Sequence, residues 1–188
     1  MSGTNIPDLI KDVNSILYLN RMVEEINRLF AFSGSVKVFF TSSINVGPNN
    51  NSYRDVTAAT DGDAIYIVAG EDVNNNCLKM LIHEYVHVCV ARTFVRQCPL
   101  WLNEGLAIIL SGQEDVEPIC PQRNSEIYKA NQDSAYFYNH SLYLTREIAK
   151  DVGIELLIDK ARNCSAFEED NLFGIENVNG ILQKKEGY

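Results

Sequence analysis

The chain has 188 residues, of which 46% are hydrophobic, enough for one domain over residues 1–188 with a single core. Its formal net charge of −9 makes nucleic acid or an anionic membrane surface an unfavourable partner. No apolar run approaches the ~20 residues that a membrane-spanning helix needs, so no membrane segment is expected.

The five cysteines, at positions 77, 89, 98, 120 and 164, are odd in number and irregular in spacing. Between Met1 and Asp12 no basic start is followed by an apolar stretch, so no secretory signal is visible. Free thiols in a reducing cytoplasm account for this pattern most simply, and we expect a cytoplasmic protein. Cys89 lies on an apolar helical stripe and is expected in the core.

The first third of the chain is predicted to hold one helix and two strands. Apolar residues at mostly helical spacing predict a helix over residues 6–30, and 36–40 is a short β-rich run. Residues 45–60 are polar and predict a loop, and 61–63, Asp-Gly-Asp, predict a turn. Residues 64–69, Ala-Ile-Tyr-Ile-Val-Ala, predict a second strand.

The rest of the chain is predicted to be helical, with loops between the helices. The predicted segments are a helix over 77–96 with cap candidates at 74–76, a helix over 100–111, a loop over 112–125, a helix over 132–152, a shorter helix through 161, and a helical turn or two within 167–185. This order predicts an α+β fold that is mainly helical, with a small N-terminal β-sheet.

The most informative motif is His-Glu-Tyr-Val-His at residues 83–87. Histidines four residues apart on a helix lie about 40° apart around its axis, so His83 and His87 can reach one metal ion. Glu84 lies beside them, where it can take a proton from a water molecule that the metal activates. Glu104, 17 positions after His87, supplies a third ligand and leaves one coordination position open, as catalytic zinc requires.

Two alternatives to a catalytic site stay open at this point. Both histidines and Glu84 could be ordinary polar residues on a half-buried helix, or the site could be a structural zinc site. The motif arises by chance in well under about 1% of chains of this length, and structural sites usually close with cysteine ligands. One catalytic Zn²⁺ per chain is therefore favoured, although imidazole and carboxylate ligands also suit other transition metals.

With Glu104 included, the pattern resembles the gluzincins, zinc peptidases whose third ligand is a glutamate on a downstream helix. Residues 100–107, Leu-Trp-Leu-Asn-Glu-Gly-Leu-Ala, are similar to the segment that bears this glutamate in the aminopeptidase N family. The 16 residues between His87 and Glu104 form a shorter gap than in that family, and resemble small single-domain gluzincin-like peptidases of bacteria and archaea. The resemblance covers about residues 60–160 and implies a zincin-like catalytic domain.

The resemblance extends into the predicted helix over 132–152. In these enzymes a tyrosine that stabilises the oxyanion lies three residues before a small residue, and a glycine lies twelve residues after the small one; Tyr138, Ser141 and Gly153 fit this spacing. The resemblance therefore implies Tyr138 as the second catalytic residue, although helix packing by the surrounding aromatic residues is an alternative. Tyr136 replaces it if the register differs. His140 is the next candidate, with an ordinary surface histidine as the simpler alternative.

We therefore expect a zinc peptidase that acts on a peptide or protein, with Glu84 as general base. The Gly-x-Met-x-Asn run that recognises the substrate amine in aminopeptidases has no counterpart here. Glu71 stands in that neighbourhood, either to bind an amino terminus or as a surface carboxylate. Endopeptidase and aminopeptidase action, and the oligomeric state, stay open. A latent processing enzyme, or a binding module that has lost turnover, remains the alternative function.

Three supporting expectations concern the surroundings of the site. The strand over 64–68 is expected to be an edge strand beside the cleft that pairs with an extended substrate. Asn103 either makes a hydrogen bond that supports a metal ligand or caps a helix. Trp101 is expected to pack the helix that carries Glu104 against the core.

Overall fold

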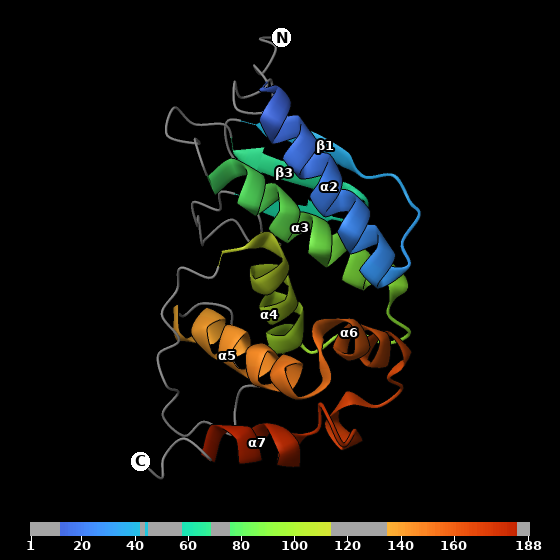
Figure 1. Ribbon diagram of the computed structural model, residues 1–188, viewed down its shortest axis with the longest axis vertical. Coiled ribbons are helices and arrows are strands. Elements are labelled where there is room, and N and C mark those ends of the chain that lie inside the picture. The colour runs from blue at the N-terminus through green and yellow to red at the C-terminus, as the bar shows by residue number, and fades with distance from the viewer. Residues whose placement is uncertain (1–11, 42–43, 45–57, 69–75, 114–134, 184–188) are drawn as a thin grey trace.

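The computed structural model describes residues 12–41, 44, 58–68, 76–113 and 135–183 of the chain. Within them the fold is α+β and mainly helical, as predicted, with the sheet and two helices in one part and four helices in the other (Figure 1). The elements in chain order are α2 (Val13–Phe30), β1 (Lys37–Thr41), β2 (Ala58–Asp61), β3 (Ala64–Val68), α3 (Asn76–Thr93), α4 (Leu100–Ser111), α5 (Ala135–Val152), α6 (Ile154–Asn163), the 3₁₀ turn η1 (Phe167–Glu169) and α7 (Ile175–Gln183).

The three strands form one sheet in the order β1-β3-β2. β1 runs parallel to β3, with Val38 opposite Ile65, and β2 runs antiparallel to β3. The turn between β2 and β3 contains Gly62 with φ of 60°, a left-handed conformation that glycine adopts without steric cost. The loop predicted over residues 45–60 is wrong at 58–60, which belong to β2, and residues 45–57 lie outside the described residues.

β3 is the central strand of the sheet, which corrects the expectation that residues 64–68 form an edge strand. The side of β3 that was expected to be open is paired with β2. The Ala-Ala-Thr sequence that begins β2 carries no alternating apolar signal, so only the pairing with β3 reveals it as a strand. Both sides of β3 are hydrogen-bonded to neighbouring strands, so β3 has no free edge to offer a substrate.

Helix α2 covers one face of the sheet beside α3 (Figure 1). It begins at Asp12, whose carboxylate accepts a hydrogen bond of 2.9 Å from the backbone N–H of Ser15 and so satisfies a free helix donor. Its buried residues lie in its last two turns and are Ile26, Leu29 and Phe30. The helix predicted over 6–30 is confirmed from residue 13 onward, and 6–11 lie outside the described residues.

Helix α3 lies between the sheet and the helical part of the molecule, and it packs against α2, β2, β3 and α4. The predicted apolar side of this helix is buried, with Leu81, Ile82, Tyr85, Val86 and Cys89 each less than one tenth exposed. The helix ends at Thr93, earlier than predicted, since the backbone N–H of Val95 donates to the carbonyl of Arg162 at 3.0 Å and no longer to its own helix.

The remaining helices build the other half of the core. α4 has the predicted bounds, and Trp101 within it is fully buried, as expected. α5 ends at Val152, and Gly153, with φ of 83°, redirects the chain into α6. The tail contains η1 and α7, in agreement with the predicted helical turns. None of the described helices is long and apolar enough to cross a membrane.

Four of the five cysteines are among the described residues, and all four are free thiols. Cys89 is fully buried, which confirms its predicted place in the core. Burial raises the pKa of its thiol to about 12, because the interior disfavours the thiolate. Cys89 is therefore a packing residue rather than a reactive one.

Replacing Ala31 by glycine is expected to stabilise the protein. Ala31 ends α2 with φ of 48° and ψ of 41°, a left-handed conformation that disfavours any residue with a Cβ atom. We expect Ala31→Gly to raise the free energy of unfolding by about 0.5–1 kcal/mol, measured by urea unfolding. Ala91→Gly, at an exposed position inside α3, is the matched control and should lower it by about 1 kcal/mol. A less stable Ala31→Gly protein would contradict the argument.

Candidate metal centre

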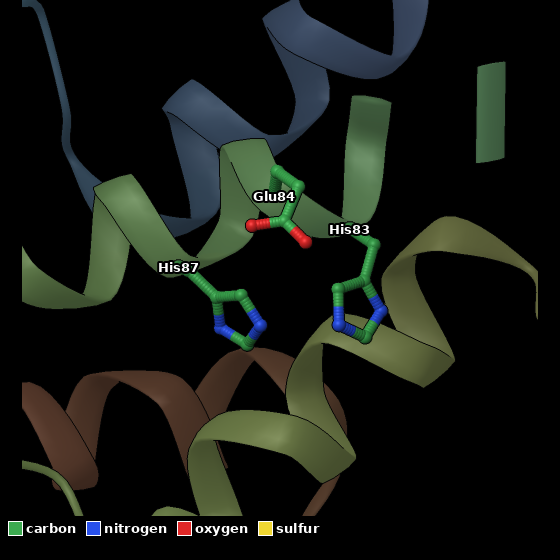
Figure 2. Close-up of side chains that lie close together, drawn as sticks. All are labelled: His83, Glu84 and His87. Atoms are coloured by element: carbon green, nitrogen blue, oxygen red, sulfur yellow. The ribbon is translucent and has the colours of Figure 1, made fainter. Parts of the chain in front are cut away.

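Two histidines on α3 face α4. Figure 2 shows the imidazoles of His83 and His87 projecting from the same side of α3, with the carboxylate of Glu84 near both. The two ring centroids are 4.7 Å apart and the rings are nearly perpendicular, at 86°. Their side chains are 13% and 12% exposed, so both rings are largely buried.

Glu104 on α4 lies opposite both rings. One of its oxygens is 3.3 Å from Nε2 of His83, and the other is 3.6 Å from Nε2 of His87. Ligands that hold zinc tetrahedrally at about 2.0–2.1 Å lie about 3.3 Å from one another, so these separations fit the edges of such a site. The three predicted ligands are thus brought together from two helices.

His87 is oriented by a residue adjacent to Glu104. Its Nδ1 lies 3.0 Å from Oδ1 of Asn103. An amide oxygen only accepts hydrogen bonds, so Nδ1 is the donor in this contact, and Nε2 is the ring nitrogen that faces Glu104. The hydrogen bond predicted as one of two roles for Asn103 is confirmed, whereas α4 begins at Pro99 without a side-chain cap.

The chemistry of these groups favours a cation between them. Glu104 is 4% exposed, and its two oxygens face the Nε2 atoms of the two imidazoles. Two imidazole nitrogens and one carboxylate oxygen form a ligand set that suits zinc and other divalent transition metals. Potential ligand atoms of His83, Glu84 and His87 also lie within 4.8 Å of one another, so this group can hold a metal ion.

Glu84 has the burial and the pKa of an acid–base group. It is 9% exposed, and its pKa is raised to about 7, first because burial disfavours the charged form. The neighbouring His87 lowers this pKa, and the charge of Glu104 raises it. A carboxyl group with a pKa near neutrality can both accept and return a proton, which general acid–base catalysis requires.

The position of α4 is fixed by a close helix crossing directly after Glu104. A Cβ atom at Gly105 would lie 2.5 Å from the carbonyl oxygen of Ser141 on α5, and closer still to the hydroxyl of Thr145. Only glycine allows this approach, because real side chains never come so near. The sequence contained Gly105 within the resembling segment, but nothing in it identified Thr145 as the facing residue.

The residues proposed around the oxyanion lie on α5. Tyr138 is 37% exposed, and its ring meets Phe137 edge to face at 5.9 Å. Ser141 is fully buried and donates a hydrogen bond of 2.8 Å to the carbonyl of Phe137, and His140 is half-buried. The side chain of Tyr136 and all of Glu71 lie outside the described residues, and the catalytic role of Tyr138 stays a prediction.

Two buried polar side chains on α5 were not singled out from the sequence. Asn139 is 5% exposed and Thr145 is fully buried, and the Oδ1 of the first and the Oγ1 of the second have no hydrogen-bond partner within the described structure. Unsatisfied buried polar atoms are costly, so these two side chains are unusual in a core. In the sequence they look like ordinary polar residues of a helix, and no pattern marked them as buried.

Replacing Gly105 by alanine should disturb both stability and the metal centre. The added methyl group forces α4 away from α5, so we expect Gly105→Ala to lose about 1–3 kcal/mol of unfolding free energy and to bind zinc more weakly. Urea unfolding and zinc titration measure the two effects. Gly180→Ala is the matched control, since a Cβ atom at Gly180 meets nothing within 4 Å. Equal stability and equal zinc affinity of the two variants would show that the close crossing of α4 and α5 does not constrain the position of α4.

Removing the side chain of Asn103 should weaken metal binding without unfolding the protein. Loss of the group that orients a ligand typically costs about 10- to 100-fold in metal affinity. We expect that loss for Asn103→Ala, measured by competition for zinc with a chelating dye. Asn103→Asp keeps an oxygen acceptor for His87 and should retain most of the affinity. An Asn103→Ala protein with unchanged affinity would show that His87 needs no such support.

Comparisons with known proteins add no family to this geometry. No protein-family model matches the chain, and neither a curated protein nor a solved structure matches it. The candidate metal centre therefore stands on the contacts of His83, His87 and Glu104 and on the polar groups around them.

Proposed function

We propose that the protein is a zinc-dependent peptidase with a zincin-like catalytic domain of the gluzincin type. The observation that carries the proposal is the approach of Glu104 to Nε2 of His83 and His87, at 3.3 and 3.6 Å, with Glu84 beside them. Zinc held by such ligands polarises a carbonyl group and acidifies water. Three protein ligands would leave one coordination position of a zinc ion for water or a substrate.

Glu84 moves the proton in the proposed reaction. Its carboxylate accepts a proton from the attacking water and then returns it to the amine that leaves when the peptide bond breaks. The pKa of about 7 supports both steps, because neither form is strongly favoured at neutral pH. Its burial also keeps bulk water from competing for the proton.

Tyr138 is proposed to donate a hydrogen bond to the oxygen that becomes negative during attack. Removing a donor of this kind typically costs about 3–4 kcal/mol of transition-state stabilisation. The close approach of Gly105 to Ser141 supports the role, since it brings the turn of α5 after Tyr138 against the residue that follows Glu104.

An extended peptide is the proposed substrate, and β2 rather than β3 is the strand that would bind it. β2 is an edge strand of the three-stranded sheet and packs against α3, the helix that carries the histidines. Backbone pairing along such an edge holds a peptide without reading many of its side chains. This arrangement favours a peptidase whose selectivity comes from few contacts.

The decisive experiment compares wild type with Glu84→Gln on a mixed peptide library, with zinc content measured on both proteins. We expect about one zinc per chain in each, and at least a ~100-fold loss of cleavage in the variant, because only the proton acceptor is removed. Glu176→Gln, an exposed glutamate on α7, is the matched control and should cleave normally.

The outcomes separate the alternatives. Zinc in both proteins without cleavage in either contradicts general peptidase activity and favours a latent enzyme or a binding module. Absence of zinc from both leaves His83 and His87 as ion-pair partners of Glu104 on half-buried helices, without a metal. Fragment ends from the wild-type digest distinguish endopeptidase from aminopeptidase action.

A further inference from the structure

A pocket lies on the side of α3 that faces away from the histidines. It has a volume of about 360 Å³ and is bounded by α2, α3, β1 and β3. Leu81 and Tyr85 form its α3 wall, two residues before and after His83, so about 200° of rotation separates them from that ligand. The metal centre and the pocket are therefore two separate features on opposite sides of one helix.

The walls of the pocket are mainly apolar. Leu19 and Val23 line it from α2, Ile65 from β3, and Val38 from β1. Val38 is 40% exposed at the pocket, whereas Ile65 beneath it is fully buried. Helix α2 thus leaves a space above β1 that the described side chains do not fill, and its volume is within the range of small-molecule sites, about 300–1,000 Å³.

One part of the lining is polar and uncharged. The hydroxyl of Tyr85 donates a hydrogen bond of 2.7 Å to Oδ1 of Asn27 on α2. Because that bond occupies the oxygen of the amide, its NH₂ group is left as a donor at the pocket. Burial raises the pKa of Tyr85 to about 12, so its hydroxyl keeps its proton.

We propose that this pocket binds a small uncharged molecule with an alkyl or aryl body and one carbonyl oxygen, which accepts a hydrogen bond from the amide of Asn27. None of the described lining side chains is charged, and the chain carries a net charge of −9, so nothing there compensates a carboxylate. Burying an unpaired charge is far more costly than burying a hydrogen-bonded carbonyl. The inference goes beyond the proposed peptidase activity and does not depend on it.

The test uses an uncharged fluorescent probe, N-phenyl-naphthylamine, with the full chain. We expect its emission to rise on binding, and octanamide to displace it at concentrations about tenfold or more below those of octanoate, which has the same body but a charged head. Probe binding that neither compound reverses, or equal displacement by both, would overturn the proposed ligand class.

Two neighbouring residues of β1 provide matched variants. Val38→Phe fills the pocket and should weaken probe binding about tenfold or more. Phe39→Leu changes the opposite face of the same strand, where Phe39 stacks on Tyr66, and should leave binding unchanged. Should Val38→Phe fail to fold by circular dichroism, Val23→Phe fills the same space from α2.

The reverse pattern would be loss of binding in Phe39→Leu and normal binding in Val38→Phe. It would show that the probe binds at Phe39 and Tyr66 on the other face of the sheet, and it would contradict binding in the pocket. Zinc content of Val38→Phe is measured in parallel and should equal that of wild type. Loss of probe binding with intact zinc content therefore tests the pocket separately from the metal centre.

Discussion

The burial of Glu104 between two helices is the constraint on which the site depends. A carboxylate that is 4% exposed loses most of its hydration, and it can remain ionised there only if nearby positive charge or strong donors replace the lost water. The Nε2 atoms of His83 and His87 lie 3.3 and 3.6 Å from its two oxygens. The arrangement is favourable when a cation is shared among these groups, and the packing of α3 against α4 holds it in place.

The geometry of the candidate metal centre is set by helices rather than by loops. Consecutive residues of α4 supply the orienting amide of Asn103, the carboxylate of Glu104 and the glycine that lets α4 meet α5 closely. A single rigid helix therefore sets three relations at once, and a shift of α4 changes all of them together. Sites supported in this way hold their geometry better than sites on mobile loops.

Sequence patterns predicted the elements that have strong local signals. The bounds of α4 and the pairing of the two histidines followed from helical periodicity and from residue chemistry that belongs to neighbouring positions. β2 was missed because its short polar and small residues become a strand only through pairing with β3, which is a long-range event. The close approach of Gly105 to Thr145 could not be predicted for the same reason, since no local pattern says which helix a glycine will face. The role of Tyr138 came from resemblance alone.

Helix α3 has no solvent-facing side from Cys77 to Val90, since no residue in that stretch is exposed. One side packs against the sheet and α2, and the other packs against α4. Either layer alone would leave one side of this helix in contact with solvent. The packing of each layer is therefore complete only when the other is in place. Folding of the two parts is therefore expected to be cooperative, and the segment that carries the histidines should be among the last to exchange its amide protons with solvent.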